Sequence, residues 1–249
     1  MMASERELHP VRTGGEGDGH RIEISASAMC FDWMQVGPQL RALELAGIDY
    51  LHWDVIDGWF APDFTMGSSI INSLRQHTHL TSDYHLMVEE PNRIFDSIEV
   101  SPGDMVTIHQ ECCRNLHRDL VALRRKGARV GVAISPGTHY DTLEYVMEDV
   151  DAITLMTVNP GFKGQKLVPQ VLRKLEKLRE VVDERGLDIK LSVDGNVSPE
   201  WVPEMVAAGA DILVGGSSGL FRVDVSIEQA IVELREAIER GLEQRRKRA

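Results

Sequence analysis

The sequence predicts an α/β fold, a single (β/α)8 barrel (TIM barrel), and three observations support this prediction. Eight short β-branched apolar runs alternate with longer helical patterns, which is typical of repeated βα units and a parallel sheet. The length of 249 residues suits one such barrel. No G-x-G-x-x-G pattern follows the first apolar run, so a doubly wound open sheet is the less favoured alternative.

The elements follow in order from these patterns. We expect strands at 22–27, 50–54, 82–87, 105–109, 129–134, 152–156, 189–194 and 212–215. Helical patterns over 40–46, 116–126, 171–185 and 199–208 each end at a glycine, the residue that best continues the chain past a helix end. Two of these exits nearly repeat, AGID at 46–49 and AGAD at 208–211, which indicates that one βα unit recurs.

The two ends of the chain differ in composition from the barrel between them. Residues 1–20 are polar and Gly-rich and lack the apolar segment of a signal peptide, so we expect a disordered N-terminal extension. The catalytic barrel domain is expected over 21–241. Residues 242–249 include the run RRKR and are expected to form a basic C-terminal tail at a solvated helix end.

Composition restricts the classes of partner. The net charge of -12 argues against nucleic acid, since binding to phosphate backbones needs a basic surface. No apolar run approaches the roughly 18 residues of a membrane span, so no membrane partner is expected. Cys30, Cys112 and Cys113 show neither metal-type C-x-x-C spacing nor the even count of a disulfide framework, which points to a reducing, cytoplasmic compartment.

Four residues with metal-binding chemistry end predicted strands. His52 and Asp54 are two residues apart and share one face of the second strand, while His85 and Asp194 lie near the ends of the third and seventh. Active-site residues of such barrels lie at this C-terminal rim. Each residue alone is more often structural, but four at one rim favour a divalent first-row metal site. Asp57 and His109 are expected to be structural or to support the ligands from behind.

Glycine-rich segments follow the sixth, seventh and eighth strands. They are NPGFKGQ at 159–165, Gly195 after Asp194, and GGSSG at 215–219. Backbone N–H groups of such loops can approach an anion closely. In barrels of this kind, a short helix after the eighth strand often contributes to phosphate binding. We therefore expect a phosphate site on this side of the barrel mouth.

Five motifs in this order resemble the ribulose-phosphate 3-epimerase family over about residues 22–221. They are H-x-DVIDG at 52–58, YHLMV at 84–88, MTVNPGF-x-GQ at 156–165, VDG at 193–195 and GS at 216–217. The resemblance implies metal-dependent epimerisation at carbon 3 of a ketose phosphate, D-ribulose 5-phosphate to D-xylulose 5-phosphate, through a planar 2,3-enediolate. It also implies a homo-oligomer, a dimer or hexamer, and one divalent ion of zinc, iron, cobalt or manganese.

The resemblance also assigns roles to residues. His52, Asp54, His85 and Asp194 would be metal ligands, and Asp54 and Asp194 would exchange protons on opposite faces of the enediolate. Ser27, His85, Met87 and Met156 would contact the substrate. The phosphate side would be held by Gly161, Phe162, Lys163, Gly164, Gly195, Asn196, Gly216 and Ser217.

Departures from the usual family pattern keep the substrate open. Ile56, Asp63, Lys163 and Asn196 stand where the family usually has Met, Asn, Gly and Gly. The segments SAMC at 27–30 and SGLF at 218–221, with Trp33, Trp53 and Trp59 as added bulk near the first two strands, resemble the D-allulose-6-phosphate 3-epimerase branch more closely. D-allulose 6-phosphate with D-fructose 6-phosphate, or a longer ketose phosphate, is therefore an alternative substrate.

Two other classes remain as alternatives. Decarboxylases related to orotidine phosphate decarboxylase use an Asp-x-Lys pair on a strand, and this chain has His52-Trp53-Asp54 without a lysine there. A non-catalytic phosphosugar-binding protein would be expected to lack one of the two proton carriers. Both Asp54 and Asp194 are present, which favours the enzyme.

Overall fold

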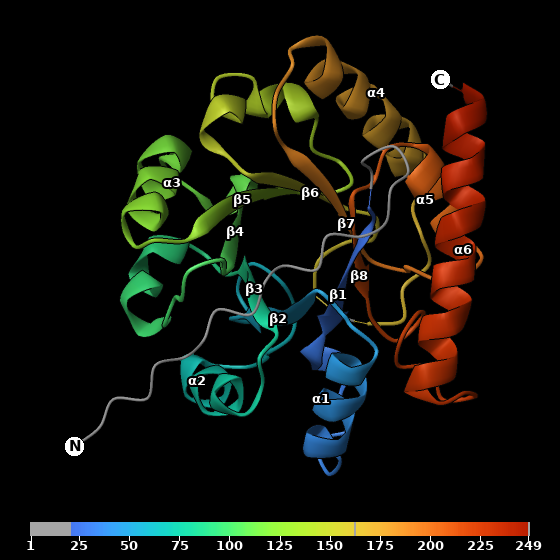
Figure 1. Cartoon of the computed structure of the whole chain (residues 1–249). Helices are drawn as coiled ribbons and strands as arrows, with labels where there is room; N and C mark the ends of the chain where they lie inside the picture. The colour runs from blue at the N-terminus through green and yellow to red at the C-terminus, as the bar shows by residue number, and fades with distance from the viewer. Residues whose placement is uncertain (1–20, 162, 249) are drawn as a thin grey trace.

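The computed structural model describes residues 21–161 and 163–248, and its centre is a closed barrel of eight parallel strands. Neighbouring strands follow the chain order, and β8 closes the barrel by pairing with β1. The strands are β1 Glu23–Ser27, β2 Tyr50–Ile56, β3 Thr81–Met87, β4 Met105–His109, β5 Arg129–Ile134, β6 Ala152–Met156, β7 Lys190–Asp194 and β8 Ile212–Gly215. Figure 1 shows helices arranged around these strands. The predicted (β/α)8 barrel is confirmed, and the expected N-terminal extension lies outside the described residues.

The helices around the barrel are α1 Val36–Leu45, α2 Ser68–Leu74, α3 Leu116–Arg125, α4 Gln170–Glu184, α5 Val202–Ala207 and α6 Ile227–Arg248. Two crossovers contain only 3₁₀ turns: η3 Pro91–Arg93 and η4 Phe95–Ser97 after β3, and η6 Tyr140–Leu143 and η7 Met147–Asp149 after β5. The expectation of a long helical segment in every unit is therefore wrong at these two places. Pro91 removes a backbone donor at the first site, and Pro136-Gly137 opens the second with two poor helix formers.

The barrel interior is apolar at its floor and polar above it. Tyr50, Met105, Ala152 and Ile212 cluster at the starts of the four even-numbered strands. Farther along the strands, the buried side chains include Ser25, His52, Asp83, Thr107, Thr154 and Ser192. Gly131 makes room for this polar filling, because a Cβ there would lie 2.2 Å from Thr107 Oγ1. The interior below the C-terminal rim can therefore hold charged groups that are hydrogen-bonded to one another.

Strand β2 separates chemistry from packing by its alternation. His52 and Asp54 face inward, whereas Trp53 between them is fully buried in the core outside the barrel. The Trp53 indole Nε1 donates to Ser82 Oγ at 3.1 Å, which satisfies its polar atom. Trp53 therefore belongs to the packing between strands and helices and does not line the barrel mouth.

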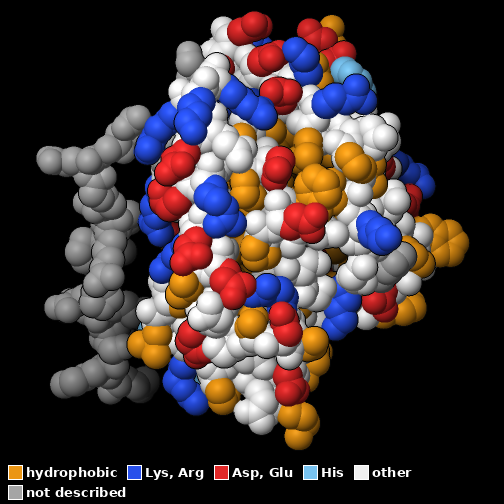
Figure 2. All heavy atoms as spheres, turned by 90° about the vertical axis from the view of Figure 1, so that its right-hand side faces the viewer, with side chains coloured by type: hydrophobic (Ala, Val, Ile, Leu, Met, Phe, Trp, Pro, Cys, Tyr) orange, Lys and Arg blue, Asp and Glu red, His pale blue; other side chains and the backbone are white. Residues whose placement is uncertain are grey.

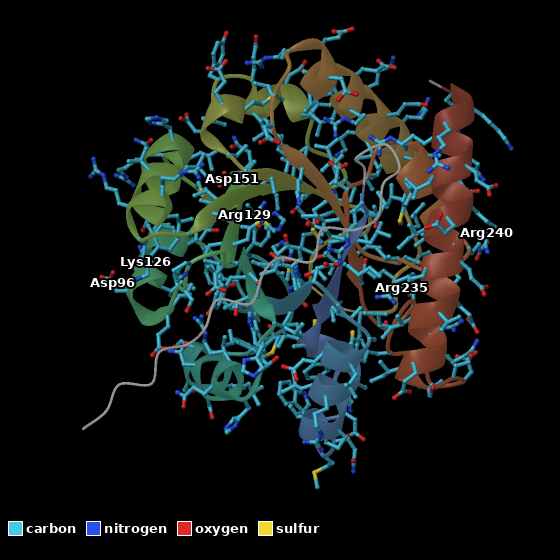
Figure 3. All side chains as sticks on the ribbon, in the orientation of Figure 1. Asp96, Lys126, Arg129, Asp151, Arg235 and Arg240 are labelled. Carbon is cyan, nitrogen blue, oxygen red and sulfur yellow. The ribbon has the colours of Figure 1, made fainter. Side chains whose placement is uncertain are left out.

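The C-terminal helix α6 packs along the outside of the barrel and includes residues 242–248, which we expected to form a basic tail. Arg235 of α6 donates to the carbonyl of Gly47 at 3.4 Å, and Figure 3 shows this side chain pointing from α6 toward α1. Arg248 pairs with Glu176 of α4 at 3.1 Å.

On the face in Figure 2, basic and acidic side chains are interspersed. In the described part of the chain, no helix is long and apolar enough to cross a membrane.

Candidate functional site

Three strands bring the four predicted metal ligands together at the C-terminal rim. The register of β2 and β3 places Asp54 beside His85, and β7 delivers Asp194 at its last position. His52 lies one pleat below Asp54 on the same face of β2. One ligand atom from each of the four residues lies within 4.8 Å of all the others.

The distances among these atoms fit one divalent ion. His52 Nε2 lies 3.4 Å from Asp54 Oδ1 and 3.8 Å from Asp194 Oδ2. His85 Nδ1 lies 3.6 and 3.2 Å from the same two oxygens. Ligands about 2.0–2.1 Å from a tetrahedral ion are roughly 3.3 Å apart. Both imidazole nitrogens are buried without a hydrogen-bond partner, which is the condition expected of atoms that ligate a metal.

His52 is supported from below by a carboxylate. Its Nδ1 lies 2.7 Å from Asp83 Oδ2, which also accepts from Ser25 Oγ at 2.8 Å. Burial favours the neutral imidazole, but the carboxylates of Asp83 and Asp54 outweigh it and raise the pKa of His52 well above its ordinary value. A carboxylate behind an imidazole fixes the ring orientation and leaves the other nitrogen for a metal.

His85 is supported differently, through a second imidazole. Its Nε2 lies 2.9 Å from His109 Nε2, and His109 Nδ1 lies 3.2 Å from Glu111 Oε2. Burial lowers the pKa of His109 to about 4. Burial also disfavours the Glu111 carboxylate, but hydrogen bonds from His109, Thr138 and the Ser135 backbone outweigh it and lower the pKa of Glu111 to about 2.

Asp54 uses its two oxygens for different contacts. Oδ1 faces the imidazoles, and Oδ2 accepts a hydrogen bond from Ser27 Oγ at 2.7 Å. Burial disfavours the charged carboxylate, yet His52 and His85 outweigh this cost and hold the pKa of Asp54 far below its ordinary value. Asp54 is therefore an oriented anion with one oxygen fixed by Ser27.

A cavity opens directly above this cluster. Of the residues predicted to form the site, those that line it are Ser27, Asp54, Met87, Met156, Gly161, Lys163, Gly164, Asp194, Gly195, Asn196, Gly216 and Ser217. His52 and His85 lie below its surface, and Phe162 lies outside the described residues. Sequence reasoning missed Met29, Cys30 and Gln165 as lining residues. Met29 and Cys30 follow the end of β1, so the strand-end rule contained the signal that could have identified them.

The loops on the proposed phosphate side are shaped by close backbone contacts. Gly195 has φ +111°, and a Cβ there would lie 2.5 Å from Val158 Cγ2, so this turn requires glycine. Asn196 has φ +45°, and its Nδ2 donates to the Gln165 carbonyl at 3.0 Å, which joins the loops after β7 and β6. The residues after β8 form consecutive turns, and their Gly-Ser-Ser-Gly sequence has low helix propensity.

In comparisons with known proteins, the family model and the relatives in sequence indicate the same family. Residues 23–221 match the ribulose-phosphate 3-epimerase family model. The chain is 37% identical over 215 residues to a ribulose-phosphate 3-epimerase of Bacillus subtilis (strain 168), covering 86% of this chain and 98% of the relative. It is 38% identical over 199 residues to the Synechocystis enzyme of the same name, covering 79% of this chain and 86% of the relative.

Solved structures support the fold at much lower identity. A 3-hexulose-6-phosphate synthase from Salmonella typhimurium matches with a TM-score of 0.59 and 15% identity, covering 88% of this chain and 100% of that one. A thiamine phosphate pyrophosphorylase from Pyrococcus furiosus matches with a TM-score of 0.58 and 13% identity, covering 89% and 97%. At these identities the likeness concerns the barrel alone.

Proposed function

Because this chain belongs to the ribulose-phosphate 3-epimerase family, we propose that it epimerises carbon 3 of a ketose phosphate, interconverting D-ribulose 5-phosphate and D-xylulose 5-phosphate. One observation carries the proposal most directly. Asp54 and Asp194 approach the same two buried imidazoles from β2 and β7 at the floor of the cavity. An epimerase of this type needs two proton carriers at one reacting carbon, and this cluster supplies two carboxylates.

The four clustered residues would hold one divalent ion, and a mixed set of imidazole and carboxylate ligands suits zinc, iron, cobalt or manganese. When bound, the ion supplies Lewis-acid stabilisation of negative charge on substrate oxygens. His52 acts as a ligand only, since its other nitrogen is held by Asp83. Asp83 and His109 contact the far nitrogens of the two imidazoles and would thereby orient the facing nitrogens for an ion.

Asp54 and Asp194 divide the proton transfers. The hydrogen on carbon 3 is acidified by the neighbouring C2 ketone, and its removal leaves a planar 2,3-enediolate. One aspartate removes this proton, and the other donates a proton to the opposite face, which inverts the centre. Ser27 holds Oδ2 of Asp54 by a hydrogen bond at 2.7 Å, which fixes the orientation of this carboxylate while Oδ1 faces the two imidazoles.

The loops after β6, β7 and β8 would orient the substrate through its phosphate. Gly161, Gly164, Gly195 and Gly216 line the cavity, and backbone N–H groups of such glycine-rich loops can bind an anion. Lys163 also lines the cavity and supplies a positive charge. Anchoring the phosphate here would place the other end of the ketose over the metal cluster, which keeps carbon 3 within reach of both aspartates.

A panel of substrates tests this proposal. The purified protein is loaded with Zn²⁺, Mn²⁺ or Co²⁺ and incubated in D₂O with five-, six- and seven-carbon ketose phosphates, and NMR follows the C3 hydrogen. We expect deuterium incorporation with inversion, fastest for the five-carbon pair. Fastest turnover of D-allulose 6-phosphate would instead assign a six-carbon substrate. Binding without any exchange across the panel would exclude the epimerase and support a phosphosugar-binding protein.

The oligomeric state and the cellular compartment stay predictions. The sequence predicts a homo-oligomer, a dimer or hexamer, in the cytoplasm. Light scattering of the purified protein would determine the assembly.

A further inference from the structure

We propose that Glu111 sets the metal-binding tautomer of His85 by acting through His109, an inference that rests on the proposed function of the cluster as a metal centre. Neither His109 nor Glu111 faces the four ligand atoms. They are positioning residues, joined to His85 Nε2, the nitrogen that points away from the cluster. Their arrangement determines which nitrogen of His85 carries the hydrogen.

The contact between the two histidines has the geometry of a ring-to-ring hydrogen bond. The ring planes of His85 and His109 are inclined by only 19°, and their centroids are 5.0 Å apart with the two Nε2 atoms at 2.9 Å. The rings therefore meet edge to edge, so an N–H in one ring plane points at the lone pair of the other. One hydrogen must lie between the two nitrogens, and either ring can supply it.

Glu111 decides which ring supplies it. A carboxylate accepts hydrogen bonds only, so the 3.2 Å contact of Glu111 Oε2 requires a hydrogen on His109 Nδ1. A neutral His109 then has a lone pair at Nε2 and accepts from His85 Nε2–H. His85 is left with a lone pair at Nδ1, the atom that faces Asp54 and Asp194. The carboxylate thus imposes the tautomer that can ligate a metal.

His85, His109 and Glu111 form a hydrogen-bonded relay. Its outer end, Glu111, is fixed to the loop after β5. Glu111 Oε1 accepts from the Ser135 backbone at 2.8 Å and from the Thr138 hydroxyl. Lys174 of α4 in turn donates to the carbonyls of Ser135, Pro136 and Thr138, each at 2.9 Å. Because Oε1 is engaged by these donors, Oε2 is the oxygen left to face His109. The side-chain orientation of Glu111 is therefore determined by its surroundings.

The two ligand histidines are consequently supported in chemically different ways. His52 contacts the carboxylate of Asp83 directly, whereas His85 reaches the carboxylate of Glu111 through an intervening imidazole. In the second arrangement, one substitution at Glu111 can reverse the tautomers of both imidazoles. That property supplies the test.

Glu111→Gln is the decisive variant. Its amide oxygen can keep the bonds from Ser135 and Thr138, which places the NH₂ group opposite His109 Nδ1. An NH₂ donor requires a lone pair there, so both imidazoles reverse and His85 Nδ1 carries the hydrogen. We expect Zn²⁺ or Co²⁺ affinity of the full-length protein, measured by titration calorimetry, to fall about 10- to 100-fold.

Glu44→Gln is the matched control. Glu44 Oε1 likewise accepts from a threonine hydroxyl, that of Thr78, and from a backbone N–H, that of His79, at 2.7 Å each, but it contacts neither relay histidine. We expect its metal affinity to equal that of the original protein. An equal loss in both glutamine variants would overturn the proposal, because it would trace the effect to general destabilisation.

Imidazole ¹⁵N NMR of the unsubstituted, Zn²⁺-loaded protein tests the tautomers without any substitution. We expect the Nδ1–H form for His109 and the Nε2–H form for His85, with His109 reversed in Glu111→Gln. An Nε2–H form of His109 in the unsubstituted protein, or unchanged tautomers and metal affinity in the variant, would overturn the proposal. These measurements need no turnover, so a failure of the epimerase assay would be distinguishable from a failure of the relay.

Discussion

Asp54 and Asp194 share one imidazole, since His85 Nδ1 lies 3.6 Å from Oδ1 of the first and 3.2 Å from Oδ2 of the second. The two carboxylates belong to β2 and β7, which are separated by β1 and β8 around the barrel. Closure of the sheet therefore brings together two anions that lie 140 positions apart in the sequence. Two carboxylates this close need positive charge between them, which the imidazoles and a divalent ion can provide.

Asp194→Asn should abolish most epimerisation while one epimer still exchanges its C3 hydrogen with solvent. The substitution removes one proton carrier and one carboxylate of the proposed metal site and leaves Asp54 in place, so at saturating metal we expect epimerisation to fall by roughly 10²- to 10⁴-fold. The epimer whose C3 hydrogen faces Asp54 should still exchange with D₂O, and the other epimer should not. NMR of each epimer separately checks this. Asp57→Asn is the control, because Asp57 caps the turn at Trp59 and Phe60 outside the cluster. Epimerisation retained in Asp194→Asn would contradict the two-carboxylate scheme.

Metal removal should lower thermal stability as well as activity. Stripping the metal leaves His52 Nε2 and His85 Nδ1 buried without a partner. An ion at 100 times its dissociation constant stabilises the folded state by about 2.7 kcal/mol. For a chain of this size we expect the melting temperature to rise by roughly 5–10 °C on adding Zn²⁺ or Mn²⁺ to chelator-treated protein. Calorimetry checks the shift. The same shift in His52→Ala would place the stabilising ion elsewhere.

The strands were predictable because each alternates or forms a short β-branched run bounded by turn residues. The strand β2 runs two residues longer than expected, through Ile56, because it stays paired with β3 as far as Met87. The 3₁₀ crossovers after β3 and β5 were not predicted, since tertiary packing rather than helical periodicity determines these short connections. The arrangement of strands in chain order followed from the repeated βα pattern alone.

The four metal-type residues were identifiable because strand ends of a barrel share a rim, so residue type and position sufficed. The relay behind His85 is different. A support role was among the expectations for His109, but its contact with His85 is a side-chain bond between β3 and β4 that no local spacing encodes. No sequence pattern indicated a role for Glu111, because that role depends on the contact between its side chain and the loop after β5. Such contacts depend on the tertiary structure and not on local sequence spacing.

Gly195→Ala should disturb the turn after β7 in two ways. The alanine must adopt φ +111°, and its Cβ would meet Val158 Cγ2 at 2.5 Å. Gly127→Ala is the matched control, since Gly127 has φ +91° but nothing within 4 Å of an added Cβ. We expect Gly195→Ala to cost roughly 1–3 kcal/mol more in the free energy of unfolding, by urea denaturation. Its KM should also rise, because the turn lines the proposed phosphate side. Equal costs in both variants would contradict the clash.

Glu111 should make stability depend on pH in the acid range. Its pKa in the folded protein is lowered from 4.5 to about 2, so the folded state binds fewer protons than the unfolded chain between these values. The carboxylate therefore stabilises the fold above pH 4.5, and this contribution is lost as the pH falls toward 2. Urea denaturation at pH 7 should show Glu111→Gln less stable by about 1–2 kcal/mol, a figure reduced for partial solvent exposure.

The difference between the original protein and Glu111→Gln should shrink as the pH falls below 4.5, because protonation removes the charge that the variant lacks. Denaturation curves at pH 7, 5, 4 and 3.5 check the trend. A difference that stays constant over this range would mean that the carboxylate is not the source of the stability. Glu111 would then act through shape alone, and the charge-dependent contact with His109 Nδ1 would lose its support.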